Sequence, residues 1–280
     1  MIRIDEMTRG RFGNRLLHYN NLMQLSSTMD TDASCVFWEG EECFSGLETY
    51  KDSQLDIKEV LNWESILNSV EINKDDNYAL GPYCIHNVFW ELTKTDPRQF
   101  IKVNEKYKRQ LPEDIVNVGI HIRGTDILGA DGNQGREIHL PEYYKNAIDL
   151  VESEFENTKY YICTDDVDFI SFMETVKYLS QKNIDFEVGS PNYFIDFATL
   201  SECDVIIASS STFTVAAGFI GKKNKKIIHS MEWINRNLNH TLWHAHDDSK
   251  YIRKWQLSFD NFWVQLYEGG NEFYHAWRFI

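Results

Sequence analysis

The chain has 280 residues, of which 42% are hydrophobic. This length is enough to bury a full core, either as one large domain or as two smaller ones. The formal net charge of −15 argues against nucleic acid and anionic membrane surfaces as partners, because both need positive patches. No apolar run reaches the roughly 18 residues of a membrane span, and Met1–Glu6 does not resemble a signal peptide. We therefore expect a cytoplasmic protein without stable membrane insertion.

The N-terminal part begins with a predicted strand, residues 2–4, and continues through a loop into a helix. The loop holds Gly10, Arg11, Phe12, Gly13 and Asn14. A glycine-containing loop between a strand and a helix can aim backbone N–H groups at an anion, or let the backbone approach a ligand closely. The same glycines would equally suit a tight turn that needs a positive φ.

The region from residue 33 to residue 114 is less regular. Residues 33–38 are a predicted strand, and residues 56–108 have a ragged and mostly helical pattern. Charged residues gather between Lys102 and Asp114, where we place a linker. The sequence thus predicts an N-terminal domain over residues 1–112 and a C-terminal domain over residues 113–280.

Residues 116–122, in which Val and Ile recur at every second position, predict a buried strand that delivers His121 and Arg123 to its carboxyl end. Ligands of parallel α/β sheets bind beyond that end of the strands. An arginine there suits a phosphate, because its rigid fork of donors can hold two oxygens at once. Asp126 follows in the loop. On the alternative interpretation, Asp126 ends a turn and His121 is a hydrogen-bonded core residue.

The next predicted strand, residues 159–163, is followed by Asp165, Asp166 and Asp168 and then by a helix. An Asp-x-Asp pair after a strand can hold a divalent metal on a nucleotide diphosphate. Aspartates are also common caps at helix N-termini. Capping of the helix at 167–181 by Asp166 or Asp168 is the favoured interpretation.

Strands and helices continue to alternate up to residue 229. Asp196 lies in a predicted helix at 194–203, and hydroxyl residues fill the loop between the strand at 204–208 and the helix at 213–220. The loop residues in question are Ser210, Ser211 and Thr212. Hydroxyls and amides at a helix N-terminus can hold phosphate oxygens. Ordinary N-capping by Ser211 or Thr212 would coexist with that role.

Strands that alternate with helices of about 10 to 15 residues predict an α/β fold with parallel, Rossmann-like sheets. The pattern beyond Trp233 predicts no definite element.

The order of these motifs resembles the fucosyltransferase superfamily, which includes α1,2-, α1,6- and protein O-fucosyltransferases. The resemblance covers about the first 25 residues and most of residues 115–220. It implies a GT-B-like fold of two facing Rossmann-like domains and an inverting transfer that needs no metal ion and no cofactor.

The resemblance also implies roles for individual residues. Arg123 matches the arginine that binds the donor β-phosphate, and His121 and Asp196 match positions around the guanine base. Ser211 and Thr212 match hydroxyls near the phosphates, and the Gly10–Asn14 loop matches the one facing the donor. Asp131 lies where the α1,6 branch carries an acidic residue proposed as the general base. The chain departs from the pattern at Gly124, where many members have a second arginine.

We therefore expect a glycosyltransferase that moves L-fucose from GDP-fucose to a glycan hydroxyl. The N-terminal domain would shape the oligosaccharide acceptor site, and the C-terminal domain would bind the nucleotide sugar. One alternative is the same fold with another donor, such as a UDP-xylose transferase that acts on a fucose-containing glycan. Another is a catalytically silent glycan-binding module, which would have no use for Arg123.

Overall fold

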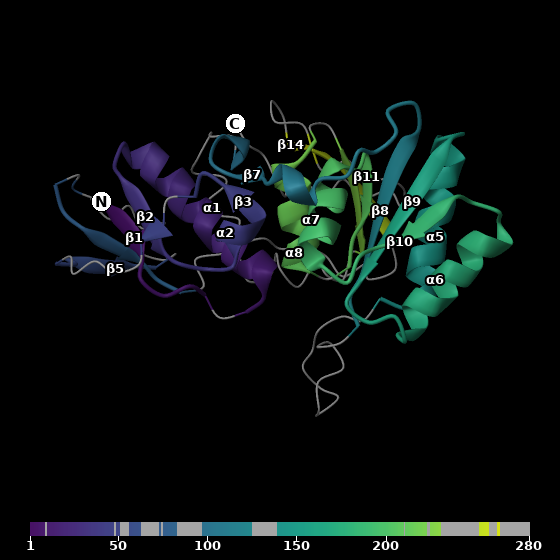
Figure 1. Ribbon diagram of the computed structural model, residues 1–280, viewed down its shortest axis with the longest axis horizontal. Helices are drawn as coiled ribbons and strands as arrows, with labels where there is room; N and C mark the ends of the chain where they lie inside the picture. Colours follow the sequence, from purple (N-terminus) through teal and green to yellow (C-terminus); the bar gives the residue numbers. More distant parts are fainter. Residues whose placement is uncertain are drawn as a thin grey trace. The chain divides into compact units, whose positions relative to one another are not determined.

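The computed structural model describes residues 1–8, 10–47, 49–50, 56–62, 73, 75–82, 97–124, 139–209, 211–222, 225–230, 252–257 and 262–263. They form two compact units (Figure 1). Unit 1 runs from Met1 to Tyr107, and unit 2 begins at Lys108. Among the described helices, none is both long and apolar enough to cross a membrane.

Unit 1 is built on a parallel sheet with the strand order β4-β2-β1-β6-β5. The strands are β1 (Ile2–Ile4), β2 (Ala33–Val36), β4 (Thr49–Tyr50), β5 (Glu59–Leu61) and β6 (Tyr78–Leu80). The long helix α1 (Phe12–Met29) connects β1 to β2 and is buried around most of its circumference. This connection places the start of α1 at the carboxyl edge of the sheet.

Smaller elements complete unit 1. The helix α2 (Gly40–Cys43) leads into β3 (Phe44–Ser45), which pairs antiparallel with β7 (Lys102–Val103). Two 3₁₀ turns, Pro97–Gln99 and Glu105–Tyr107, lie on either side of β7.

The helical prediction for residues 56–108 is wrong for the part of this region that the structure describes. Residues 59–61 and 78–80 are the strands β5 and β6, and β6 is buried next to β1. A strand of three residues is too short to show a period of two, so its apolar residues can be mistaken for part of a helix. Pairing with β1 and β5 decides the conformation of β6.

Unit 2 contains a seven-stranded sheet with the order β10-β9-β8-β11-β12-β13-β14. The first five strands in this order are parallel, and the last two are added antiparallel. The parallel strands are β8 (Val116–Ile122), β9 (Thr158–Thr164), β10 (Phe186–Val188), β11 (Val205–Ile207) and β12 (Lys226–Ser230). The antiparallel strands are β13 (Ile252–Leu257) and β14 (Phe262–Trp263).

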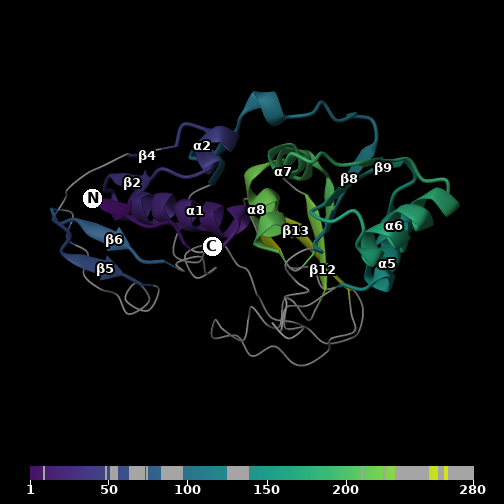
Figure 2. The same cartoon turned by 60° about the horizontal axis from the view of Figure 1, so that its bottom comes forward.

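Helices cover both faces of this sheet. The pair α5 (Pro141–Glu154) and α6 (Ile170–Gln181) lies on one face, and the pair α7 (Tyr193–Glu202) and α8 (Thr212–Ile220) lies on the other (Figures 1 and 2). β8 is accordingly buried over nearly its whole length. The predicted α/β class with Rossmann-like parallel sheets is confirmed.

A buried lysine joins the two helices of the second face. The Lys225 side chain is fully buried, and its ammonium donates hydrogen bonds to the carbonyl oxygens of Ser201 and, at 3.2 Å, of Ala217. Ser201 is near the C-terminus of α7, and Ala217 is in the second half of α8. A cation at this end complements the partial negative charge of helix C-termini.

Candidate functional site

The strand order of unit 2 reverses between β8 and β11. The chain proceeds from β8 to β9 and β10 on one side, whereas β11 and β12 lie on the other. In open α/β sheets, ligands bind outside the carboxyl ends of the strands at such a switch point. His121 and Arg123 lie at the end of β8, and Ser211 and Thr212 follow β11. The structure therefore brings these predicted residues to one edge of the sheet.

His121 connects the two halves of the switch point. Its Nδ1 atom is 2.7 Å from the Ser209 hydroxyl and 3.1 Å from the Thr214 hydroxyl, and its ring lies 5.0 Å from that of Phe213. With 8% of its surface exposed, it is a buried residue with hydrogen-bond partners. His121 thus fixes the loop after β11 against the end of β8.

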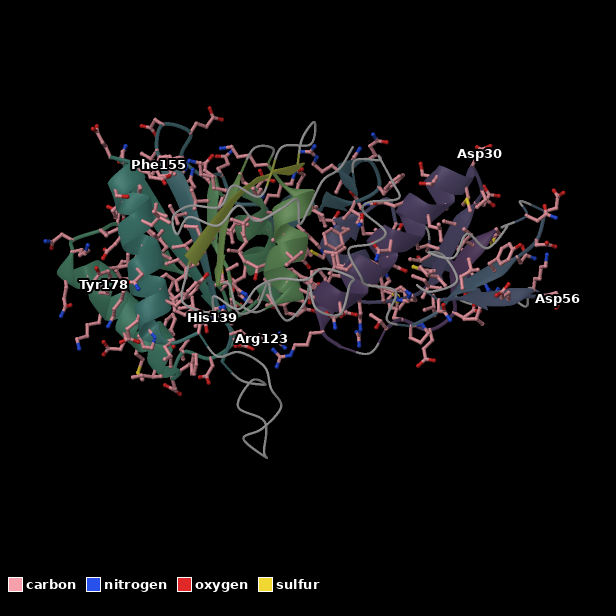
Figure 3. All side chains as sticks on the ribbon, turned by 180° about the vertical axis from the view of Figure 1, so that it is seen from behind. Asp30, Asp56, Arg123, His139, Phe155 and Tyr178 are labelled. Atoms are coloured by element: carbon pink, nitrogen blue, oxygen red, sulfur yellow. The ribbon has the colours of Figure 1, made fainter. Side chains whose placement is uncertain are left out.

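Arg123 is half-buried and directly follows β8. Figure 3 shows it at the same edge of unit 2 as His139, whereas Phe155, beyond the end of α5, lies at the opposite edge. The adjacent amide, Gly124 N–H, donates a 2.7 Å hydrogen bond to Asp165 Oδ1.

Close packing explains why position 124 is a glycine. A Cβ atom there would lie 2.9 Å from Cβ of Asp166 and 3.0 Å from Cβ of Phe169. The loop after β9 therefore packs directly on the backbone where many superfamily members have a second arginine. Glycine in place of a second arginine is therefore required by the packing of this loop.

The predicted helix-capping role of Asp166 or Asp168 is wrong. α6 begins at Ile170, and its N-cap residue is Phe169, which makes no side-chain capping bond. Asp166 Oδ1 instead accepts the Asp168 amide at 3.0 Å, an Asx turn before the helix starts. No group of three His, Cys, Asp or Glu side chains that could hold a metal ion occurs in the described part of the chain.

Asp196 is a buried carboxylate in the first turn of α7, with 5% of its surface exposed. Its Oδ1 accepts the Ser190 amide at 2.7 Å, and a Cβ on Gly189 would lie only 2.5 Å from the same oxygen. Burial raises the pKa of Asp196 from 3.8 to about 6, although the Ser190 amide opposes this shift.

α7 and α8 are joined through aromatic rings close to Asp196. The ring of Phe197, the next residue, lies 5.3 Å from that of Phe213, which in turn stacks on His121. Asp196 and His121 therefore belong to one packed neighbourhood of unit 2.

The N-terminus of α8 faces the switch point with an ordinary cap. The Ser211 hydroxyl accepts the Phe213 amide at 3.2 Å, so the capping interpretation is confirmed for Ser211. Thr212 is the first residue of the helix. The first amides of a helix have no intrahelical partner and point outward, so this cap is compatible with an anion at the same terminus.

The glycine loop belongs to unit 1. Gly10 has a φ of 127°, which confirms the turn that needs a positive φ. Phe12 is buried, with its ring 6.0 Å from Trp38 and 5.7 Å from Phe44. Its ring is part of the core, so the loop offers backbone, the exposed Arg11 and the half-buried Asn14 to a ligand.

Three predicted site residues, Asp126, Asp131 and Ser210, lie outside the described residues. Two residues of the site were not predicted, namely Asp165 as the acceptor for the Gly124 amide and Thr214 as a partner of His121. A signal for Asp165 existed, because a residue directly after β9 must lie beside the residues directly after β8 if the two strands are parallel neighbours. Thr214 carried no comparable signal.

Comparison with known proteins gives the family. The family model described as glycosyl transferase family 11 matches residues 102–257, which is more than half of the chain. A search among curated proteins finds no match.

Several solved structures are similar. FUT1 of Arabidopsis thaliana, a mutant in complex with GDP, has a TM-score of 0.51 at 9% identity, over 81% of this chain and 70% of that one. POFUT1 in complex with GDP-fucose has a TM-score of 0.49 at 10% identity, over 77% and 92%. The E. coli heptosyltransferase WaaC has a TM-score of 0.42 at 11% identity, over 78% and 86%. The likeness to the Arabidopsis protein covers most of both chains and agrees with a GT-B-like fold.

The switch-point site of unit 2 lies within the residues that match the family model. The chain therefore belongs to glycosyl transferase family 11, within the fucosyltransferase superfamily, and is a glycosyltransferase.

Proposed function

We propose that this glycosyltransferase moves L-fucose from GDP-fucose to a hydroxyl of an oligosaccharide, with inversion at the anomeric carbon and without a metal ion. The observation that carries the proposal is the arrangement at the switch point of unit 2. Arg123 and the N-terminus of α8 lie at the carboxyl ends of neighbouring parallel strands.

This arrangement suits the departure of a diphosphate. As the bond from the anomeric carbon breaks, negative charge grows on the leaving phosphate, and stabilising that charge is the main difficulty of the step. The guanidinium of Arg123 can hold two phosphate oxygens, and the first amides of α8 add a fixed positive partial charge. Donors fixed in advance lower the barrier because they need no reorganisation.

The base of the donor would be read by Asp196. Guanine presents two adjacent hydrogens, on N1 and N2, which match the two oxygens of one carboxylate. Uracil presents a single N–H between two carbonyl groups, so it cannot satisfy a carboxylate in this way. In support of the choice, the Arabidopsis protein of similar fold was solved in complex with GDP.

The acceptor side completes the proposal. We assign donor binding to the domain at residues 113–280, and acceptor binding to the domain at residues 1–112. A base must take the proton of the acceptor hydroxyl as the new bond forms. Asp131 is the residue we propose for this step, and its role rests on the resemblance to the α1,6 branch.

Gly124 favours one alternative, a transferase with another donor such as UDP-xylose. With no side chain at position 124, the site has one arginine where many superfamily members have two. A smaller cationic field at the diphosphate fits a donor whose binding depends more on its base and sugar.

A panel of nucleotides tests the proposal and this alternative together. Thermal shift with GDP, UDP and ADP should show stabilisation by GDP alone, and slow hydrolysis should be seen with GDP-fucose but not with UDP-xylose. Stabilisation by UDP without GDP would refute the fucosyl donor. Tight binding of a free oligosaccharide with no response to any nucleotide would instead favour a silent glycan-binding protein.

A further inference from the structure

The loop after β9 holds the backbone beside Arg123. Asp165 Oδ1 accepts the Gly124 amide at 2.7 Å. The loop is itself fixed, because the Thr164 hydroxyl accepts the Asp166 amide and donates to the Asp166 carbonyl oxygen, both at 3.1 Å.

Strand register places Asp165 next to Arg123. β8 and β9 pair in parallel, with Ile122 opposite Thr164. The next residue on each strand is therefore Arg123 on one side and Asp165 on the other. The contact therefore follows directly from the pairing of the two strands.

The contact acts on the conformation of Arg123. The Gly124 nitrogen belongs to the planar peptide group that also contains the Arg123 carbonyl. A fixed Gly124 N–H therefore fixes the ψ angle of Arg123, and with it the direction in which the chain leaves the strand. Asp166 and Phe169 leave no room for a Cβ atom on Gly124, so the loop after β9 also packs closely on this part of the backbone.

We propose that Asp165 is a positioning residue that orients Arg123 through the Gly124 amide. This inference rests on the proposed function, in which Arg123 holds the donor diphosphate. The role needs an acceptor oxygen at Oδ1 and requires neither the negative charge of Asp165 nor a metal ion. An asparagine can supply the same oxygen, and an alanine cannot.

The chain offers a matched control in the same loop. Asp168 is an exposed aspartate like Asp165. Its backbone amide is bonded to Asp166, and its carboxylate makes no hydrogen bond within the described part of unit 2. Asp168→Ala removes the same charge from the same loop and leaves the Gly124 contact in place.

The first experiment compares Asp165→Ala, Asp165→Asn and Asp168→Ala by steady-state kinetics and by melting temperature. Loss of positioning in Asp165→Ala should lower kcat/KM by about 10- to 100-fold, mostly through kcat. Asp165→Asn should stay within about threefold of wild type, because its oxygen still accepts the amide, and Asp168→Ala should be unchanged. An asparagine variant as impaired as the alanine variant would overturn the proposal, since it would mean that the negative charge of Asp165 is itself required.

Asp165→Asn also decides the question if Asp165→Ala does not fold. Near-wild-type kinetics supports the role of an acceptor oxygen, and a tenfold or greater loss in a folded Asp165→Asn protein contradicts it.

The second experiment asks whether Asp165 acts through Arg123. The specificity constant kcat/KM for the nucleotide sugar is measured for wild type, Asp165→Ala, Arg123→Ala and the double variant. If Asp165 only orients Arg123, adding Asp165→Ala to Arg123→Ala should change the constant by less than about twofold. Independent, multiplying losses would mean a direct contact between Asp165 and the nucleotide, and the positioning role would be rejected.

The two proposals fail in different ways. If wild type binds no guanine nucleotide, the proposed donor is wrong. If wild type binds GDP and transfers sugar while Asp165→Ala behaves like wild type, only the positioning role is wrong.

Discussion

The buried carboxylate of Asp196 predicts how donor binding depends on pH. We expect the affinity for GDP-fucose to fall about tenfold between pH 7 and pH 5, because only the ionised carboxylate can accept both hydrogens of guanine. Asp196→Asn should bind more weakly at pH 7 and should not share this loss. The test therefore compares how the affinity of wild type and of Asp196→Asn depends on pH.

The magnitude follows from the raised pKa. Burial brings the pKa of Asp196 to about 6. The apparent dissociation constant grows in proportion to 1/f, where f is the ionised fraction. This factor is about 1.1 at pH 7 and about 11 at pH 5. A carboxyl with the ordinary aspartate pKa near 3.8 would give about 1.1 even at pH 5, so its affinity would not change over this range.

The assay should use the nucleotide sugar. The terminal phosphate of GDP itself titrates near pH 6, as other phosphate monoesters do, and its titration would obscure that of Asp196. The diphosphate of GDP-fucose is esterified at both ends and keeps its charge over this range. Isothermal titration at several pH values then gives the dissociation constant, with circular dichroism to show that the protein stays folded.

Asp196→Asn separates the effect of this carboxylate from that of any other group of the site. The asparagine oxygen can still accept the Ser190 amide, so the local backbone keeps its partner. A pH dependence that persists in Asp196→Asn would assign the effect to another group. A wild-type affinity that is flat from pH 7 to pH 5 would refute the base-binding role of Asp196 directly.

Four further predictions concern stability, the leaving group and the metal. Between pH 3.8 and about 6, folded Asp196 keeps a proton that the unfolded chain loses, so the stability of the free protein falls as the pH rises. Asp196→Asn should therefore stabilise the free protein by up to about 3 kcal/mol at pH 8 and by almost nothing at pH 4, as measured by urea denaturation; equal gains at both pH values would contradict the pKa shift. Arg123→Ala should lower kcat/KM by more than about 100-fold with an unchanged melting temperature, and an active Arg123→Ala enzyme would refute the leaving-group role. As a control, Lys182→Ala removes a positive charge from an exposed pair with Asp149 and should leave kcat/KM unchanged. Transfer should survive excess EDTA to within about threefold, and complete loss that Mn²⁺ restores would show that a metal carries the charge instead. Lys225→Met should lower the free energy of unfolding by about 1–3 kcal/mol, because two buried carbonyl oxygens lose their donor; an equally stable variant would show that the buried ammonium has no net stabilising effect.

The sequence was sufficient to predict elements and site residues where a local pattern and a general rule of α/β sheets act together. The Val and Ile residues of 116–122 predict β8, and the rule for carboxyl ends then places His121 and Arg123 at the ligand edge. Both are found at the end of that strand. The alternation of strands and helices in the second half is likewise long and regular enough to be read without a structure.

The features of the site that were not predicted depend on contacts between distant parts of the chain. Thr214 meets His121 across 93 positions, and this contact exists only because β11 is inserted beside β8. Strand order is not written in local periodicity, so neither partner could be inferred. The mistaken cap at Asp166 has a similar cause, since the helix start is set by how Phe169 packs and not by the nearest aspartate.

The close packing around Gly124 also bears on how this enzyme can change over generations. Any side chain at this position meets the Cβ atoms of Asp166 and Phe169, which belong to the stem of each residue and cannot rotate away. Two adjacent arginines at this site therefore require the loop after β9 to be rebuilt before, or together with, the change at position 124. In a directed-evolution experiment, a second arginine should emerge only from libraries that vary position 124 together with the length and backbone of the loop after β9.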